Sequence, residues 1–269
     1  MIKELGIFKS YKEVMDYFPR SVIEINGRAK WIKEMFVDDL EKHICGRTDG
    51  GVPISINQKL SVFNPALGME ILKVWSKVGD KVIDPFAGRD RAIITNFMER
   101  HYTGYEISPL TYKATKKKIT AWKHRNKAYT IDYKKGDGIW LSGEEPATYD
   151  FCYSCPPYWN KEKYESVKGQ LSDMTYADWK SSILNLAENL KPLLKKDAYA
   201  VFVIADIRDK GEMLSLHSDW IYAFKQEGWK LHDTIINRTN PINVSGINGY
   251  LRNRFFMKSH EYLLVFKNS

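Results

Sequence analysis

Long apolar runs and cysteines are both scarce in this 269-residue chain, and each scarcity excludes a class of protein. No stretch approaches the roughly 18 uninterrupted apolar residues that a membrane-spanning helix needs. The three cysteines, Cys45, Cys152 and Cys155, lack the paired spacing of a zinc site, so we expect neither a disulfide framework nor a metal. The N-terminus also lacks the layout of a signal peptide, which predicts a cytosolic protein.

Positive charge and hydrophobic residues are both plentiful. A net charge of +8 at pH 7 attracts polyanions over long range, in a way that salt weakens, so nucleic acid is the expected partner. A basic surface that binds nothing explains the charge equally well. A hydrophobic content of 43%, with 13% aromatic residues, is typical of a globular chain and predicts one domain with appendages.

Short strand patterns alternate with helical patterns along most of the chain. Strands are expected at residues 81–84, 102–106, 129–133, 149–153, 199–205, 231–237 and 261–267. Helices are expected at residues 65–75, 91–99, 109–122 and 176–194. This alternation predicts an α/β fold with a mostly parallel sheet and helices on both of its faces. Residues 1–60 indicate an N-terminal helical extension, and residues 61–269 the main domain.

The most informative segment is Ser154–Trp159 (SCPPYW), which directly follows an expected strand. Two prolines cannot continue a parallel strand, so the backbone must leave the sheet there. In an open α/β sheet the carboxyl end of a strand faces the crevice that binds ligands. A stiff corner followed by aromatic residues suits the binding of a flat, amine-bearing ring such as a nucleobase, although an ordinary proline turn is the alternative.

Three acidic residues fall at the carboxyl ends of consecutive expected strands. Asp84 begins residues 84–91 (DPFAGRDR), where a glycine lets the backbone approach a ligand closely. Glu106 comes 22 residues later, close to the spacing at which an acid binds ribose hydroxyls. Asp137 follows the third strand and can accept a hydrogen bond from the amine of an adenine ring.

Together these segments resemble the class I S-adenosylmethionine-dependent methyltransferases, specifically the DNA amino-methyltransferases that modify adenine N6 or cytosine N4. The resemblance covers about residues 63–267 and implies a seven-stranded Rossmann-like sheet, which Lys258–Lys267 completes as a final hairpin strand. It implies that Glu106 binds the ribose of S-adenosylmethionine and that Asp137 binds the adenine. The other residues that it assigns to the cofactor are Phe63, Asn64, Pro65, Asp84, Phe86, Ala87 and Gly88.

The same resemblance implies that the target base is flipped into the proline corner. Its amine would lie in line with the sulfonium methyl group, with acceptors that pull on the amine hydrogens. The Pro156 carbonyl would be one acceptor, and the Cys155 sulfur or the Ser154 hydroxyl the second. Tyr158 would stack on the base. The expected catalytic set is therefore Ser154, Cys155, Pro156, Pro157 and Tyr158.

Two residues depart from the family pattern. Asp90 occupies the place of the second glycine in a DPFxGxG loop, so the backbone must accommodate a Cβ and a charge. Cys155 stands where Asp, Asn or Ser is usual, and a thiol is a poor acceptor. Its likeness to serine weakly favours cytosine N4, whereas the breadth of the family slightly favours adenine N6. Alternatively, Cys155 is a nucleophile toward cytosine C6, although in carbon-5 methyltransferases the cysteine follows a proline.

Basic and aromatic residues outside this site are expected to contact DNA. An insertion at about residues 238–258 is the candidate for sequence recognition, because Asn and Arg can bind base edges bidentately; an ordinary solvated loop is the alternative. Lys116–Lys118 are expected on a solvated helix face, Cys152 in the core, and His260 in a structural role. The expected DNA contacts are Trp159, Lys161, Lys163, Arg208, Arg238, Asn240, Arg252 and Arg254.

The predicted function is methylation of an exocyclic amine of a DNA base by a phage-like or restriction-associated enzyme. Two other functions remain open. One is an S-adenosylmethionine-binding DNA protein without turnover, which decay of the site at Asp90 and Cys155 would favour. The other is a methyltransferase for an RNA or protein amine, because an amine on a flat group is the shared requirement.

Overall fold

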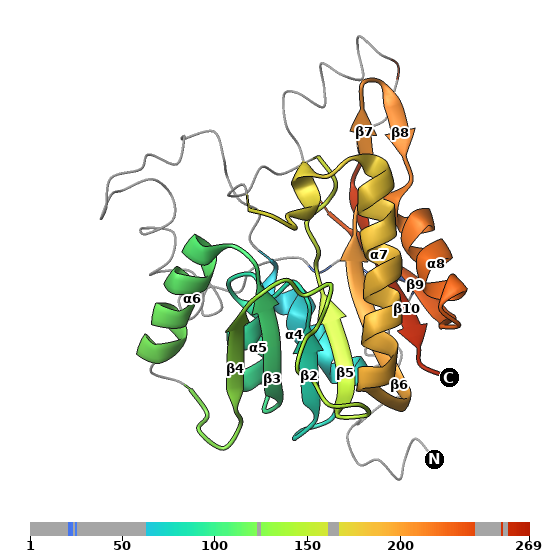
Figure 1. Ribbon diagram of the computed structural model, residues 1–269. Helices are drawn as coiled ribbons and strands as arrows, with labels where there is room; N and C mark the ends of the chain where they lie inside the picture. The colour runs from blue at the N-terminus through green and yellow to red at the C-terminus, as the bar shows by residue number, and fades with distance from the viewer. Residues whose placement is uncertain are drawn as a thin grey trace, which may run out of the picture.

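A doubly wound α/β sheet organises the chain in the computed structural model (Figure 1). The structure describes residues 21–23, 25, 63–122, 125–160, 167–239, 254 and 258–269. Nearly all of the expected N-terminal extension and most of the insertion at about residues 238–258 therefore lie outside the described residues. Within the described part of the chain, no helix is long and apolar enough to cross a membrane.

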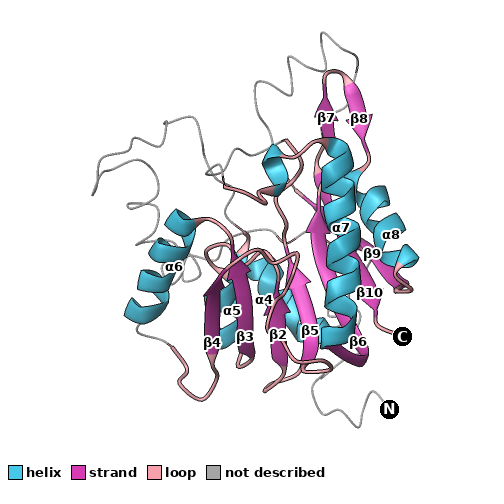
Figure 2. Cartoon of the chain, viewed as in Figure 1, coloured by secondary structure: helices cyan, strands magenta, loops and turns pink. Residues whose placement is uncertain are grey.

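Strands and helices alternate, and Figure 2 shows the strands of the main sheet gathered in one layer between helices, with one short pair of strands apart from it. The strands are β1 (Val22–Ile23), β2 (Lys81–Asp84), β3 (His101–Glu106), β4 (Ile131–Lys135), β5 (Tyr149–Ser154), β6 (Leu194–Ile204), β7 (Ile207–Asp209), β8 (Glu212–Leu214), β9 (Lys230–Arg238) and β10 (His260–Lys267). The helices are α4 (Pro65–Trp75), α5 (Arg91–Phe97), α6 (Pro109–Ala121), α7 (Tyr176–Leu190) and α8 (Leu216–Gln226), with 3-10 turns at η2 (Leu171–Asp173) and η3 (Lys191–Leu193).

The main sheet has the strand order β1-β9-β10-β6-β5-β2-β3-β4. β10 runs antiparallel to its neighbours β6 and β9, and the other pairs are parallel. All seven expected strands are present, and the two-residue β1 adds an eighth beside β9. From β2 the chain proceeds outward through β3 and β4, then crosses to β5 on the other side. A reversal of this kind marks the place where open α/β sheets bind ligands, outside the carboxyl ends of the strands.

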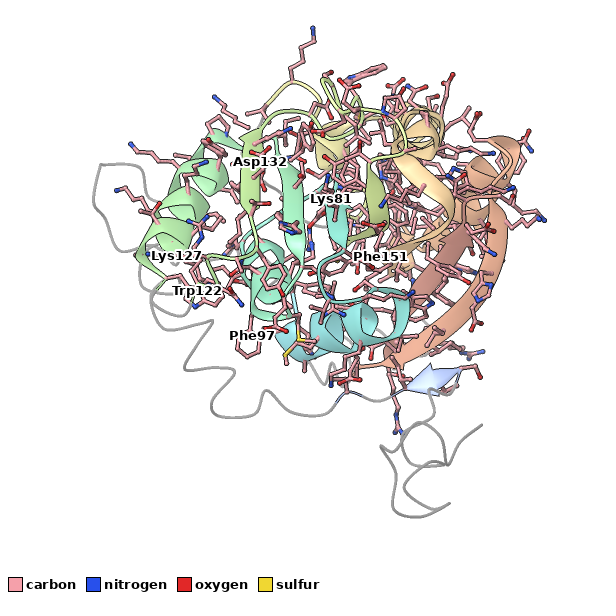
Figure 3. All side chains as sticks on the ribbon, turned by 90° about the horizontal axis from the view of Figure 1, so that it is seen from below. Lys81, Phe97, Trp122, Lys127, Asp132 and Phe151 are labelled. Atoms are coloured by element: carbon pink, nitrogen blue, oxygen red, sulfur yellow. The ribbon has the colours of Figure 1, made fainter. Side chains whose placement is uncertain are left out.

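Alternate side chains of the central strands enter two hydrophobic cores, one on each face of the sheet. Ile83 and Cys152 pack in the core beneath α7 and α8, whereas Val82 and Phe151 pack in the core beneath α4, α5 and α6. Figure 3, which looks at the sheet from below, shows α4 and α5 on the opposite face from α7. The prediction that Cys152 is a core residue is confirmed, and burial raises the pKa of its thiol.

Two helix starts lie next to the carboxyl edge of the sheet because local sequence signals place them there. The Ser108 hydroxyl caps α6 by accepting a hydrogen bond from the Thr111 amide at 3.1 Å, and a proline occupies the first turn. Asn64 caps α4 in the same way, through the Ala66 amide at 3.1 Å. Because α6 begins directly after β3, its cap also fixes the loop that carries Glu106.

Candidate active site at the carboxyl edge of the sheet

Three loops meet at the carboxyl ends of β2, β3 and β4. The Gly136 amide donates to the Glu106 carbonyl at 3.0 Å, which joins the second loop to the third. Gly138 lies so close to the first loop that a Cβ built on it would be 1.8 Å from the Pro85 carbonyl oxygen. The structure therefore brings together the three acidic segments that the sequence suggested.

Asp84 is fully buried, and its carboxylate is committed to bonds within the protein. Its Oδ2 pairs with Arg91 Nε at 2.7 Å and accepts from the Tyr102 hydroxyl at 2.9 Å. Its Oδ1 accepts from the Phe86 amide at 3.1 Å and from the Ser154 hydroxyl. These bonds join β2 to β3, to β5 and to the start of α5, so Asp84 fixes the shape of the loop.

Arg91 is the cation at the centre of this arrangement, a role that its own segment of the sequence does not predict. Burial disfavours its charge, but the Asp84 carboxylate outweighs burial and raises the pKa of the guanidinium above its ordinary value. The guanidinium also donates to the Phe86 carbonyl and lies 5.1 Å from the centre of the Phe63 ring. Phe63 thus contacts the loop after β2 through Arg91.

Glu106 and Gly88 form the part of the site best suited to a sugar. Gly88 has a φ of +58°, a conformation that disfavours any side chain. Its amide and the Ser108 amide, the latter at 2.8 Å, both donate to the Glu106 carboxylate. Burial opposes these two bonds and raises the pKa of Glu106 to about 7. A partly buried carboxylate beside a glycine that permits close approach fits the two hydroxyls of a ribose.

Asp137 lies in the third loop, where a segment from beyond the proline corner covers it. Its Oδ1 accepts from the Ile139 amide at 3.0 Å, and burial raises the pKa of the carboxyl group. A Cβ built on Gly169 would lie 2.8 Å from Asp137 Oδ2 and 3.0 Å from Ile107 Cδ1. The Asp137 carboxylate can accept a hydrogen bond from a ring amine, and the Ile107 methyl group can pack against the face of that ring. This combination fits an adenine.

Asp90, in the second glycine's place, causes no backbone strain. Its φ of −120° is open to any residue, so a glycine is not needed there. Its carboxylate pairs with Lys118 Nζ of α6 at 2.5 Å, with side-chain exposures of only 6% and 10%. The prediction that Lys116–Lys118 form a solvated face is confirmed for the first two residues and wrong for Lys118, because Asp90 draws its ammonium inward.

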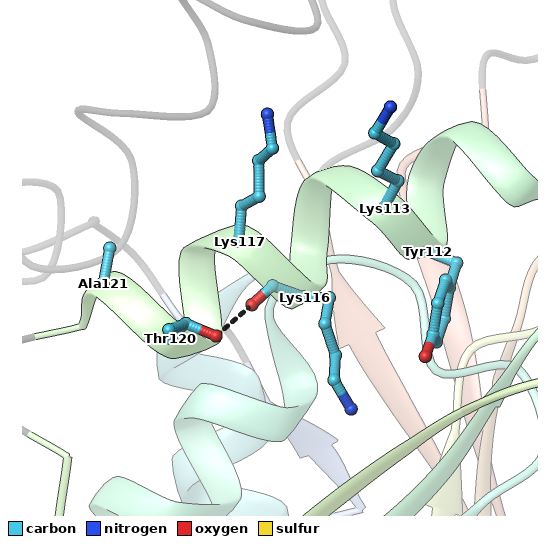
Figure 4. Close-up of a pocket in the computed structure, with 6 residues that line it drawn as sticks. All are labelled: Tyr112, Lys113, Lys116, Lys117, Thr120 and Ala121. Carbon is cyan, nitrogen blue, oxygen red and sulfur yellow. Dashed lines mark hydrogen bonds between the residues drawn. The ribbon is translucent and has the colours of Figure 1, made fainter.

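The remaining lysines of α6 line a shallow hollow on the outer side of that helix (Figure 4). Lys113 and Lys117 point away from the domain, whereas Lys116 reaches back to the Tyr133 carbonyl at 3.4 Å. Three lysines thus border the hollow, which lies outside the acidic loops described above. Its other lining residues are Tyr112, Thr120 and Ala121.

The proline corner begins where β5 ends, at Ser154. Pro156 is buried and Pro157 is partly exposed. Tyr158 is only 7% exposed, and its ring belongs to the core beneath α7 and α8. Its hydroxyl lies 3.9 Å from Cys155 Sγ and donates to Glu261 Oε1 at 3.4 Å. The corner therefore places a thiol, a phenol and a carboxylate side by side.

Trp159, expected to contact DNA, is partly buried against its own domain. Its indole N–H donates to the Met174 carbonyl at 2.8 Å, and its ring centre lies 5.0 Å from that of Tyr176. The next residue, Asn160, donates to Asp209 Oδ1 in the β7–β8 hairpin at 3.3 Å. These contacts tie the outer part of the corner to the segment before α7 and to the hairpin.

The other expected DNA-contacting residues are scattered or outside the described residues. Arg208 donates to the Gly211 carbonyl at 2.9 Å across the β7–β8 turn. Arg238 ends β9 and is exposed, as is Arg254. Lys161, Lys163, Asn240 and Arg252 lie outside the described residues.

A second polar cluster, which was not predicted from the sequence, lies at the same carboxyl edge of the sheet. Asp206, 5% exposed after β6, binds His217 Nδ1 at 2.7 Å. Burial raises the pKa of Asp206, but the hydrogen bonds and the charge of His217 outweigh burial, so the net shift of that pKa is downward. The His217 ring stacks 4.1 Å from the Tyr262 ring, whose hydroxyl is 3.1 Å from His260 Nε2.

Glu261 is a further residue of this edge that was not predicted, because its position opposite the corner depends on the pairing of β10. In the described part of the chain no group of His, Cys, Asp or Glu could hold a metal ion.

Comparisons with known proteins identify a matching family and a shared fold. Residues 149–269 match the family described as DNA methylase, from β5 and the proline corner to β10, which confirms the resemblance over that part. No curated protein sequence matched the chain. The match and the fold together support S-adenosylmethionine as the cofactor.

Several solved methyltransferases share the fold. A SAM-dependent methyltransferase from Methanosarcina mazei aligns with a TM-score of 0.51 at 10% identity, over 77% of this chain and 98% of its own. A methyltransferase from Pyrococcus furiosus aligns with a TM-score of 0.51 at 15% identity, over 86% and 93%. A geranyl diphosphate methyltransferase aligns with a TM-score of 0.52 at 10% identity, over 76% and 78%. Such identities show the fold alone.

Proposed function

From a methyltransferase fold whose residues 149–269 match the DNA methylase family, we propose that this chain methylates an exocyclic amine of a DNA base. One observation carries the proposal: the hydroxyl of Ser154, where the proline corner begins, donates a hydrogen bond to Asp84, the first residue of the loop proposed to hold the cofactor (the cofactor loop, residues 84–91). This bond supports the proposal because it joins the segment proposed for the base to the loop proposed for the cofactor. An amine held at the corner lies beside a methyl donor held at the loop.

S-adenosylmethionine supplies a methyl group made electrophilic by its sulfonium. In our proposal Glu106 accepts hydrogen bonds from the ribose hydroxyls, and Asp137 accepts a hydrogen bond from the adenine amine. Gly88 and Ala87 let the backbone approach the cofactor. Asp84 acts indirectly, because its carboxylate already holds Arg91, Tyr102, Phe86 and Ser154. Phe63, Asn64 and Pro65 support the loop from the start of α4.

The target base enters the corner with its amine toward the Pro156 carbonyl and Cys155. Tyr158 turns its hydroxyl edge toward the base amine, and since only 7% of its surface is exposed, that edge must be uncovered when DNA binds. Flipping a base costs a few kcal/mol, so such a rearrangement belongs to the same binding step. Adenine N6 is slightly favoured over cytosine N4. The proposed setting is phage or restriction-associated DNA modification.

Incubation with labelled S-adenosylmethionine and unmethylated genomic DNA, followed by nucleoside digestion and mass spectrometry, tests this function. N6-methyladenine or N4-methylcytosine is the expected product. 5-Methylcytosine would instead make Cys155 a nucleophile. Cofactor binding without any methylated nucleoside would point to a binding-only protein or to an RNA or protein substrate, which parallel reactions with RNA and peptides distinguish.

A further inference from the structure

The proposed reaction leaves one requirement unmet at the corner. A target amine has two hydrogens, and its lone pair is freed best when both meet acceptors. The Pro156 carbonyl is one acceptor. The second position belongs to Cys155, whose thiol is a weak acceptor. A stronger acceptor is therefore needed within reach of the same amine.

We propose that Glu261, acting through the Tyr158 hydroxyl, is a positioning residue that supplies the acceptor function that Cys155 lacks. The inference rests on the proposed function and deepens it. The Tyr158 hydroxyl is the shared neighbour, 3.9 Å from Cys155 Sγ and 3.4 Å from Glu261 Oε1. Carboxylate and thiol thus flank one phenol at the corner where the base enters.

The topology of the sheet explains why a residue so distant in sequence lies there. β10 is antiparallel to β6 and β9, so it begins at the edge where those strands end. Glu261 is its second residue and is paired with Asn237 of β9. Asn237 Nδ2 donates to Glu261 Oε2 at 3.5 Å, and Glu261 Oε1 accepts from the Tyr158 hydroxyl. Bonds of this length commonly tighten when substrate binds.

Asn237 adds a second observation in favour of a polar device at this point. It is 5% exposed, and its Oδ1 is buried without a hydrogen-bond partner in the described part of the chain. An amide buried with an unsatisfied oxygen is costly for stability alone. A role in orienting the Glu261 carboxylate, through the bond from Asn237 Nδ2, explains why an amide is buried here at this cost.

The chemistry follows from the hydrogen-bond directions. A phenol that donates to a carboxylate becomes a better acceptor, because hydrogen bonds in a chain polarise one another. The Tyr158 oxygen then accepts an amine hydrogen. As the amine nitrogen bonds to the methyl carbon, the carbon–sulfur bond breaks with its electron pair on sulfur. The nitrogen loses one proton to the Tyr158 oxygen, while the Tyr158 hydroxyl proton passes to Glu261.

Four variants test this path: Glu261→Gln, Tyr158→Phe, their combination, and Glu188→Gln as a matched control on the exposed face of α7. We expect Glu261→Gln to lower kcat by about 100-fold, the size of effect typical of acid–base groups, with the KM for DNA and for S-adenosylmethionine nearly unchanged. Tyr158→Phe should lower kcat similarly. The double variant should be no slower than either single one, because both changes break one chain of bonds. Glu188→Gln should behave as the native chain.

Binding of S-adenosylhomocysteine by calorimetry, together with the thermal midpoint, should be unchanged in every variant, because Glu261 lies outside the cofactor loops. Native kcat in Glu261→Gln overturns the inference but leaves the proposed function standing. Should Glu261→Gln fail to fold, native kcat in Tyr158→Phe overturns it equally, since the same bond is lost from the other side. If the native chain methylates no base, the proposed function fails and this inference with it.

Discussion

At the scale of single residues, the carboxylates of Asp84 and Glu106 lie in different environments. Asp84 is fully buried and pairs with Arg91, so its charge is balanced within the protein. The burial of Glu106 is only partly offset by the amides of Ser108 and Gly88, and its pKa is raised to about 7. Glu106 therefore changes its charge near neutral pH, at the position proposed for the ribose.

Cofactor affinity should consequently depend on pH. Below pH 7 Glu106 is mostly protonated and loses acceptor capacity toward the ribose hydroxyls; above pH 7 it is ionised. We expect the affinity for S-adenosylhomocysteine, measured by calorimetry, to rise about tenfold from pH 6 to pH 8, which is the change in the ionised fraction of one such group. In Glu106→Gln the affinity should be weaker and flat. A flat profile in the native chain would contradict the role of Glu106.

The same titration affects stability with the opposite sign. A carboxyl group whose pKa is raised on folding, here from 4.5 to about 7, contributes stability that is fully present below about pH 4.5. That contribution is lost as the pH rises through about 7. Without ligand, Glu106→Gln should therefore gain thermal stability relative to the native chain as the pH is raised from 6 to 8. An equal midpoint difference at both pH values would argue against the raised pKa.

Gly138 and Gly136 offer a matched test of how the loops are packed. A Cβ on Gly138 would lie 1.8 Å from the Pro85 carbonyl, which is backbone and cannot move aside cheaply. A Cβ on Gly136 would lie 3.5 Å from Tyr105, an ordinary contact. We expect Gly138→Ala to cost at least about 2 kcal/mol of unfolding free energy in urea, and Gly136→Ala less than about 1 kcal/mol. Equal costs would mean that the loops are not held this close.

At the scale of elements, α6 is joined to the loop after β2 by one buried ion pair. Lys118 on α6 meets Asp90, which precedes α5, and both are at least nine-tenths buried. Removing one member of such a pair leaves a charge without its partner, which typically costs about 3–5 kcal/mol. We expect Lys118→Met to lower the unfolding free energy by about this amount and to weaken S-adenosylhomocysteine binding, because the loop before α5 loses its anchor.

Neighbouring residues provide the comparison for that experiment. Lys117→Met, on the exposed side of the same helix, should change neither quantity measurably. The double variant Lys118→Met with Asp90→Asn removes both charges and should recover part of the lost stability. If Lys118→Met and Lys117→Met behave alike, the pair does not support the loop.

Elements whose signals lie in their own segment were predicted from the sequence. Elements whose existence or bounds depend on pairing with distant strands were not. The bounds of β2 and α4 were predicted to the residue, because Asn64, Pro65 and a β-branched run mark them. β4 lies two residues later than expected. β6 begins at Leu194 rather than at residue 199, because the three polar residues that follow Leu194 do not show a strand pattern. α8 and the β7–β8 hairpin were not predicted. Lys210 and Gly211 both have positive φ, so the Lys-Gly pair was an available turn signal.

Within the site, the predictable part was again the local part. Acids after strands, a glycine after Asp84 and prolines after β5 all follow from chain position. The bonds from Tyr102 and Ser154 to Asp84 join separate strands, so they depend on register. Lys118 and Glu261 are missed for the same reason: nothing in their own segments distinguishes an inward lysine or glutamate from a solvated one.

At the scale of the whole molecule, the net charge of +8 coexists with several acidic residues at the candidate active site. The positive charge must therefore lie elsewhere, and the exposed lysines of α6, together with Arg238 and Arg254, account for part of it. A phosphate backbone is attracted to such surfaces over long range, whereas a small cofactor is not. Salt should thus separate the two binding events.

Duplex DNA binding should weaken steeply with salt, while cofactor binding should not. Each phosphate contact contributes about −0.9 to the slope of log K against log salt, so we expect a slope of about −3 or steeper by fluorescence anisotropy between 50 and 200 mM KCl. Arg254→Ala should make it shallower by about 1, whereas Lys225→Ala, at the opposite edge near the end of α8, should leave it unchanged. The affinity for S-adenosylhomocysteine should stay nearly constant over the same range. A DNA affinity that is independent of salt would mean that the net charge of the chain serves no part of DNA binding.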